Sequence, residues 1–137
     1  MILDDHLGLW TLAGRRAAHW EDGVPAIPWG FHFRLVRAVI DFRRRGRLTR
    51  ELDFRVARIA AAPPVHVLRI LDPRQLTVTA ARLTARYPLS MVAAELLAAG
   101  KVHAEPVHVA ADNLGRTWHH VAAAEGIDLR VEPAPPA

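Results

Sequence analysis

The sequence contains no cysteine, which excludes disulfide bonds, thiolate metal ligands and a cysteine nucleophile. Ser90 is the only serine, and it precedes an alanine-rich stretch where a helix cap is expected, not a Gly-x-Ser-x-Gly elbow. Glycine-rich phosphate loops of the Gly-x-Gly-x-x-Gly and Gly-x-x-x-x-Gly-Lys types are also absent. These absences argue against thiol and serine hydrolases, dinucleotide enzymes and P-loop NTPases.

Long hydrophobic runs are missing as well. No apolar stretch approaches the ~18 residues of a membrane span, and Asp4 and Asp5 interrupt the first one before a secretory signal forms. We therefore expect a soluble, cytoplasmic protein with no membrane association. The 137 residues, 51% hydrophobic and 23% charged, suit a single globular domain. We assign it to residues 1–132, and the proline-rich residues 133–137 to a disordered tail.

Lysine is nearly absent, so arginine carries the net charge of +4. Seven arginines fall between residues 34 and 50. Guanidinium groups bind phosphate in a bidentate manner, which makes this segment a candidate surface for RNA or for an acidic protein segment. A solvated helix face is the alternative interpretation. The candidate RNA-binding residues are Arg34, Arg37, Arg43, Arg44, Arg45 and Arg47.

Strand-like and helix-like patterns alternate along the chain. This alternation predicts an α/β fold with three layers, α/β/α, around a central parallel sheet of four or five strands. Gly100 and Gly126 are expected to end helices in the left-handed conformation. The predicted strands cover residues 1–4, 24–28, 65–68, 107–110 and 127–131. The predicted helices include 29–42, 49–61, 76–86, 91–99 and 116–125, with a further one before Gly14.

Acidic residues follow two of the predicted strands. Asp4 and Asp5 end the first, and Asp112 follows the strand over 107–110. The carboxyl ends of neighbouring parallel strands open into one crevice, so we expect these carboxylates to meet. Hard divalent cations prefer oxygen ligands, which suggests a metal site for phosphodiester chemistry. The alternative is that each acid only caps the helix that follows it.

Three motifs occur in a fixed order along the chain. They are Ile2-Leu3-Asp4 followed by His6-Leu7-Gly8-Leu9-Trp10, Leu89-Ser90 before an alanine-rich helix, and Ala110-Ala111-Asp112 before a helix ending in Ala-Glu-Gly-Ile. Together they resemble the PIN-domain family, and the resemblance covers nearly the whole chain. It implies a compact α/β nuclease, related to bacterial toxins of toxin–antitoxin pairs, that cuts RNA with Mg²⁺ or Mn²⁺ held by three or four acids. It also implies an antitoxin-like protein partner and a homodimer.

The chain departs from the family at two of four acidic positions. Asp4 matches the first acid, with Asp5 beside it, and Asp112 matches the fourth. Arg34 best matches the second, where we expect it to point into the crevice and pair with Asp4 or Asp112. Ala93 takes the third place. Glu95 lies about 200° further around that helix, so it is expected to point away from the site.

Two carboxylates bind a divalent ion more weakly than four, so we expect a degenerate metal site at Asp4 and Asp112. The expected function is a non-cleaving RNA- or protein-binding module, a pseudoenzyme of the toxin–antitoxin nuclease type. The alternative is an active Mg²⁺- or Mn²⁺-dependent endoribonuclease, in which Asp4, Asp5 and Asp112 hold one metal. A third hypothesis is a subunit that engages an antitoxin-like helix through an apolar groove.

The aromatic and histidine residues leave several roles open. Trp10 and Trp118 are expected in the core, whereas Trp20 and Trp29 border loops, where they fill the core or an interface or stack on a base. The eight histidines lack His-x-x-x-His spacing and are expected at the surface or half-buried.

Overall fold

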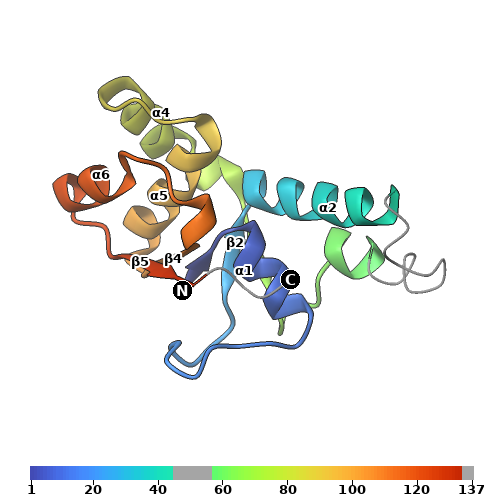
Figure 1. Cartoon of the computed structure of the whole chain (residues 1–137). Coiled ribbons are helices and arrows are strands. Elements are labelled where there is room, and N and C mark those ends of the chain that lie inside the picture. The colour runs from blue at the N-terminus through green and yellow to red at the C-terminus, as the bar shows by residue number, and fades with distance from the viewer. Residues whose placement is uncertain (45–56, 134–137) are drawn as a thin grey trace.

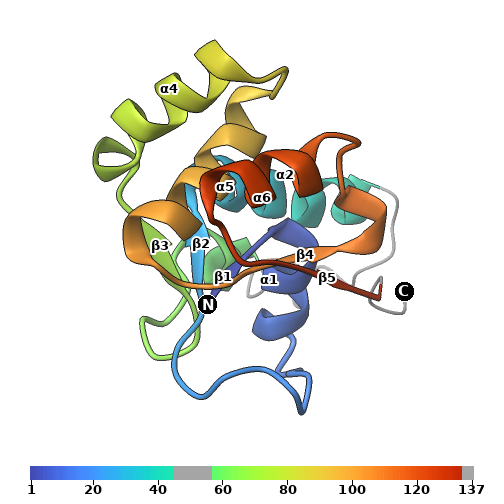
Figure 2. The same cartoon turned by 90° about the vertical axis from the view of Figure 1, so that its left-hand side faces the viewer.

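The computed structural model describes residues 1–44 and 57–133, and a five-stranded parallel sheet forms its centre. The strand order is β3-β2-β1-β4-β5, and every adjacent pair runs parallel. Helices flank the sheet on both sides (Figures 1 and 2). The predicted three-layer α/β/α fold is therefore confirmed. The strands are β1 (Ile2–Leu3), β2 (Ala26–Pro28), β3 (Arg69–Leu71), β4 (Val107–Ala110) and β5 (Leu129–Glu132).

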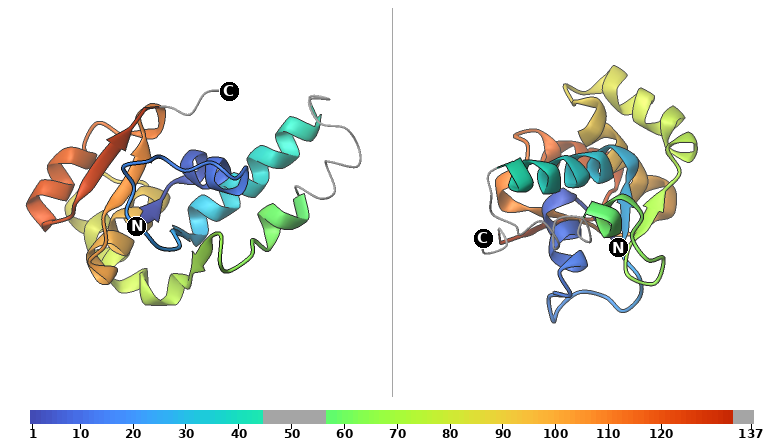
Figure 3. Two further views of the ribbon diagram at one scale, coloured as in Figure 1. Left: turned by 90° about the horizontal axis from the view of Figure 1, so that it is seen from below. Right: turned by 90° about the vertical axis from the view of Figure 1, so that its right-hand side faces the viewer.

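The helices divide between the two faces of the sheet. In Figure 2, α1 lies below the sheet, and α5 and α6 lie above it. Figures 1 and 3 show α2 extending well beyond the sheet, with the helical segment 57–61 beside it. The helices are α1 (Asp5–Leu12), α2 (Trp29–Arg44), α4 (Thr77–Arg86), α5 (Met91–His103) and α6 (Trp118–Glu125), with 3-10 turns η1 (Pro73–Gln75) and η2 (Ala111–Asn113).

Strand alternation sets which side chains meet which helix layer. Ile27 and His108 lie in register with Leu3, so these three side chains share one face of the sheet. Ile27 contacts α1, because a Cβ atom added to Gly8 would lie 3.0 Å from its Cδ1 atom. Val107 faces the opposite way, toward α5. A buried histidine therefore belongs to the α1 side of the core.

Helix α2 is amphipathic, as the spacing of its apolar residues predicts. Phe31, Leu35 and Val39 follow one another at four-residue spacing, and all three are buried. The His32 Nε2 atom lies 2.6 Å from the Ala60 carbonyl oxygen and joins α2 to the segment 57–61. These contacts pack α2 against the core and against the segment 57–61.

The strand predicted over 65–68 is wrong. Residues 65–67 form a turn, in which the Val67 and Leu68 amides both donate to the Pro64 carbonyl. The strand is β3, which begins at Arg69. The β-branched residues that suggested a strand follow two prolines, and the chain has to turn after them before it pairs with β2. Tertiary pairing outweighed local strand propensity here.

Gly100 does not end a helix, contrary to prediction. Helix α5 continues to His103, and its left-handed C-cap residue is Ala104, with φ 51°. Gly100 instead lies against β4, where an added Cβ atom would overlap Val107 and lie 3.1 Å from Ile127. Gly126 does cap α6 in the left-handed conformation, as predicted. The two glycines thus serve different needs, close packing and backbone conformation.

Some predictions concern residues outside the described ranges. The helix predicted over 49–61 is helical where it is described, at 57–61. The tail predicted over 133–137 is described only at Pro133. Of the described helices, none combines the length and the apolar character needed to span a membrane.

We expect Gly100→Ala to lower the free energy of unfolding by about 1–3 kcal/mol, because the added methyl group overpacks the contact between α5 and β4. Urea denaturation followed by circular dichroism measures the change. Gly30→Ala in α2 is the matched control, because an added Cβ atom there would meet its neighbours only at 3.4 Å or beyond. An equal loss in both variants would refute close packing as the reason for Gly100.

Candidate functional site

The candidate site lies at β1, where the order of the strands across the sheet changes direction. β1 pairs with β2 on one side and with β4 on the other, so the carboxyl ends of β1 and β4 flank a crevice at the switch point. Asp4 and Asp5 follow β1, and η2, which contains Asp112 and Asn113, follows β4. The prediction that the tips of these two strands lie side by side is confirmed.

The Asp4 carboxylate is fully buried and accepts three hydrogen bonds. Its Oδ1 atom accepts from the Leu7 amide at 2.9 Å, which caps α1. Its Oδ2 atom accepts from the Ala110 amide at 2.8 Å and from Asn113 Nδ2 at 2.9 Å. Burial raises the pKa of Asp4 above its ordinary value, although these hydrogen bonds act to lower it. Asp4 is therefore both a helix cap and a member of the crevice.

Asn113 and Arg34 occupy the space beside the two acids of β1. Asn113 Nδ2 donates to Asp5 Oδ1 at 2.7 Å as well as to Asp4. The Arg34 Nε atom lies 3.5 Å from Asp5 Oδ2, and its Nη2 atom donates to Asn113 Oδ1 at 3.3 Å. The expectation that Arg34 points into the crevice is thus confirmed. Its predicted pairing with Asp4 or Asp112 is wrong, because its ionic partner is Asp5.

Asp112 points away from the buried pair. Its side chain is exposed, and its Oδ1 atom lies 3.0 Å from His6 Nδ1. The residue of η2 that reaches Asp4 is Asn113, one position further along the chain. Within residues 1–44 and 57–133, no three His, Cys, Asp or Glu side chains are grouped closely enough to hold a metal ion. Asp4, Asp5 and Asp112 therefore do not form such a group of three, and the weak metal site expected at Asp4 and Asp112 stays a prediction.

The charge of Arg34 disfavours a cation in this crevice. At about 5 Å and an effective dielectric constant of ~20, a fixed unit charge repels a monovalent cation by about 3 kcal/mol and a divalent one by about twice that. Arg34 also forms an ion pair with Asp5, and this carboxylate would otherwise attract a metal ion. A side chain of the same molecule thus offsets part of the negative charge of the crevice.

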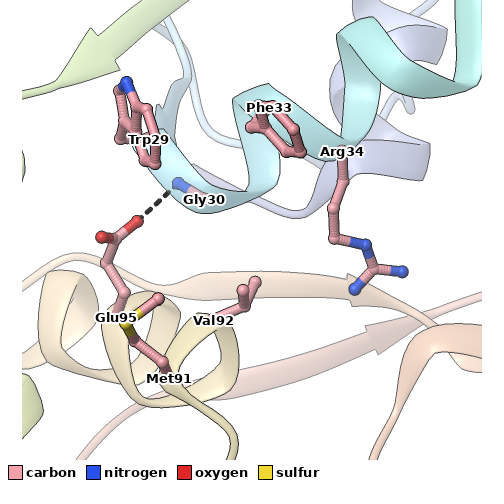
Figure 4. Close-up of a pocket in the computed structure, with 7 residues that line it drawn as sticks. All are labelled: Trp29, Gly30, Phe33, Arg34, Met91, Val92 and Glu95. Atoms are coloured by element: carbon pink, nitrogen blue, oxygen red, sulfur yellow. Dashed lines mark hydrogen bonds between the residues drawn. The ribbon is translucent and has the colours of Figure 1, made fainter.

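A second feature is an open pocket of about 350 Å³ between α2 and α5 (Figure 4). Its apolar walls come from exposed side chains, with Glu95 at one end and Arg34 at the other. The Glu95 Oε1 atom accepts a hydrogen bond from the Gly30 amide at 2.8 Å. The apolar lining residues are Trp29, Phe33, Met91 and Val92.

Ala93 and Glu95 of α5 point in different directions. Ala93, expected to face the site, is 2% exposed and belongs to the hydrophobic core. Glu95 was expected to point away from the acidic crevice, and it lies at the end of the pocket opposite Arg34, where it accepts from the Gly30 amide. The helical geometry correctly separated the directions of Ala93 and Glu95. It could not say which of the two directions leads to the core.

The exposed side of α2 carries an aromatic–arginine stripe, which consists of Trp29, Phe33 and Arg37. Four-residue spacing places these three side chains on one helix face. Trp29 and Phe33 are 51% and 56% exposed, and their rings stack with centroids 6.1 Å apart and an interplanar angle of 24°. Arg43 and Arg44 lie at the end of the same helix, and Arg45 and Arg47 fall outside the described residues.

A buried polar cluster on the α1 side was not expected from the sequence. His108 is fully buried, and its Nδ1 atom lies 2.7 Å from Glu132 Oε1, while His19 Nε2 lies 2.8 Å from Glu132 Oε2. Trp20 is 5% exposed and packs edge-on against His108. The expectation of surface or half-buried histidines is therefore wrong for His108. These contacts attach the loop between α1 and β2 to the sheet.

The sequence reasoning missed Asn113 and His6 because it searched the strand ends for carboxylates alone. Each residue directly follows an acid of the site, Asp112 and Asp5 respectively. That adjacency was the available signal, since polar side chains at a strand end share the same crevice. A side-chain amide that donates to two carboxylates uses acceptor positions that would otherwise be open to a metal ion.

Removal of the Asn113 amide should destabilise the protein in a pH-dependent way. The pKa of Asp4 is raised from 3.8, so the Asp4 contribution to stability is complete at low pH and is lost as the pH rises through the folded-state pKa. Asn113 counters that loss by donating to the ionised carboxylate. We expect Asn113→Ala to lower the free energy of unfolding by about 1–3 kcal/mol at neutral pH, and by less below the ordinary Asp pKa.

Urea denaturation at neutral pH and near the ordinary Asp pKa measures this difference. Asp112→Ala is the control, because an exposed ion pair contributes little, and we expect a change below about 0.5 kcal/mol. A loss for Asn113→Ala that is the same at both pH values would contradict its role as a donor to the ionised Asp4.

Comparison with known proteins adds no assignment to this geometry. No model of a known protein family matches the chain, and no curated protein matches it.

Proposed function

We propose that this protein is a PIN-like domain that binds single-stranded RNA without cutting it. The observation that carries the proposal is the occupation of the acidic crevice by Arg34 and Asn113. The sequence resemblance to PIN domains and the parallel α/β sheet support the family. The proposal also places the protein in the cytoplasm, where single-stranded RNA is present.

The absence of cleavage follows from the state of the acids. Metal-assisted hydrolysis of a phosphodiester requires carboxylate oxygens that are free to bind the metal. Both Asp4 oxygens already accept hydrogen bonds from the protein, and both Asp5 oxygens contact Asn113 or Arg34. A metal would have to displace these partners and overcome the Arg34 charge. The crevice is therefore proposed as a stabilising element of the fold.

Binding of single-stranded RNA is supported by the surface of α2. Single strands are bound by aromatic side chains that stack on bases and by cations that follow the phosphates. The aromatic–arginine stripe offers both on one helix face, and further arginines follow it in the sequence. The net charge of +4 favours a polyanionic partner. A protein partner, such as an antitoxin-like helix or a second copy of this chain in a homodimer, is the competing proposal for this surface.

Metal titration tests the claim that Arg34 and Asn113 keep metal ions from binding in the crevice. By isothermal titration calorimetry with Mn²⁺, we expect the wild-type protein to bind more weakly than about 100 μM. Arg34→Ser combined with Asn113→Asp removes the positive charge and adds a carboxylate beside Asp4 and Asp5. We expect that double variant to bind Mn²⁺ at least about tenfold more tightly than the wild type.

Arg37→Ser combined with Asp112→Asn is the control, because it changes an exposed arginine of α2 and an exposed acid outside the buried pair. We expect it to leave Mn²⁺ affinity unchanged. Tight wild-type binding that is abolished by Asp4→Asn, together with RNA cleavage, would overturn the proposal in favour of an active Mg²⁺- or Mn²⁺-dependent endoribonuclease.

Salt-dependent binding tests the RNA surface. We expect a labelled oligouridylate of about 12 nucleotides to bind in fluorescence anisotropy, with an affinity that falls as salt rises. Replacement of Arg43, Arg44, Arg45 and Arg47 by serine should weaken binding. It should also reduce the slope of log K against log salt by about 0.7 for each phosphate that the protein no longer neutralises.

Single substitutions show which surface binds the RNA. Arg37→Ser should weaken binding, whereas Arg82→Ser, which removes an exposed arginine from α4, should not. If the oligouridylate does not bind at any salt concentration, the RNA proposal fails, and a protein partner for the stripe is favoured.

A further inference from the structure

We infer that the pocket between α2 and α5 is a nucleobase site that selects guanine in single-stranded RNA. This inference rests on the proposed RNA-binding function and names the base that this surface prefers. Three features of the pocket suit such a base, namely its aromatic wall, the carboxylate of Glu95 and the guanidinium of Arg34 at the opposite end.

The aromatic wall suits the face of a base. Trp29 and Phe33 present large exposed ring surfaces (Figure 4), and because the two rings stack on each other, the outer face of the pair is an apolar platform for one base. Stacking of bases on such rings is a main source of affinity for single strands and does not depend on the base. The volume of about 350 Å³ falls within the ~300–1,000 Å³ of small-molecule sites. The platform supplies affinity but no selectivity.

The carboxylate of Glu95 supplies the selectivity. Its hydrogen bond from the Gly30 amide fixes the group at the end of the pocket and uses only one of about four acceptor positions. An ionised carboxylate accepts hydrogen bonds and donates none. The matching base must therefore present neighbouring N–H groups and no acceptor toward Glu95.

Guanine meets this requirement best. Its Watson–Crick edge carries the N1–H and N2–H donors side by side, which match the two oxygens of a carboxylate. Adenine and cytosine place an acceptor nitrogen beside their amino group, and uracil has one N–H between two carbonyl oxygens. Single-stranded bases are unpaired, so this edge is available for recognition.

The charges of the pocket orient the nucleotide. Glu95 lies at one end of the pocket and Arg34 at the other (Figure 4). Arg37 follows Arg34 one turn further along α2. A nucleotide has its donor-bearing base at one end and its phosphate at the other. We therefore expect the base to lie toward Glu95 and the phosphate toward the arginines. In this orientation the donors of the base face a carboxylate, and the phosphate anion faces guanidinium cations.

The test compares two labelled oligouridylates of about 12 nucleotides that differ only in one central guanine or adenine. By fluorescence anisotropy, we expect the wild-type protein to bind the guanine oligonucleotide about tenfold more tightly. Glu95→Gln should reduce this preference to about twofold or less, with little change for the adenine oligonucleotide, since glutamine still accepts from the Gly30 amide. Phe33→Ala should weaken the binding of both oligonucleotides by about fivefold or more, because guanine and adenine both stack on the aromatic platform.

Asp22→Asn is the matched control, because it removes one exposed negative charge from the loop before β2, and it should keep the tenfold preference. Thermal unfolding checks that each variant is folded. RNA binding without a guanine preference, or a preference that survives Glu95→Gln, would overturn the guanine pocket and leave the proposed function standing. Failure of the wild-type protein to bind either oligonucleotide would overturn both.

Discussion

The side-chain amide of Asn113 is the interaction on which the candidate site depends. One nitrogen donates to Asp4 and Asp5 together, and the oxygen of the same group accepts from Arg34. These contacts tie the turn after β4 to the tip of β1, to the first turn of α1 and to α2. Two neighbouring carboxylates in a buried setting repel each other, so a donor between them is needed to hold both. Asn113 meets that need without a metal ion.

The direction in which each acid points decides its chemistry. Asp4 is turned into the protein, where two backbone amides fix both of its oxygens. Asp5 shares its oxygens between an amide and a guanidinium, and Asp112 faces solvent beside His6. The three acids are close along two strand ends, yet they do not aim at one point. Proximity of strand tips is thus necessary for a metal site and not sufficient for one.

The sequence could predict the layers of the fold and the meeting of the two strand tips, because both depend on apolar periodicity and on the geometry of parallel sheets. It could not predict that Asn113 would replace Asp112 beside Asp4, since a shift of one residue within a 3-10 turn redirects a side chain. The burial of Ala93 depended on which face of α5 enters the core. The burial of His108 depended on Glu132, a partner on another strand. Each of these misses involves a contact between segments distant in sequence.

Arg34 lies between the crevice and the pocket, so one side chain contributes to both the blocked metal site and the proposed RNA site. Its guanidinium contacts Asp5 and Asn113 on one side and lines the pocket beside Phe33 on the other. In the resemblance to PIN domains, this position is best matched to an acid that holds the metal. An arginine in place of an acid removes a metal ligand, pairs with Asp5 and places a cation where a phosphate can bind. Under the proposed function, Arg34 therefore contributes both to the loss of cleavage, together with Ala93 at the third acidic position, and to RNA binding.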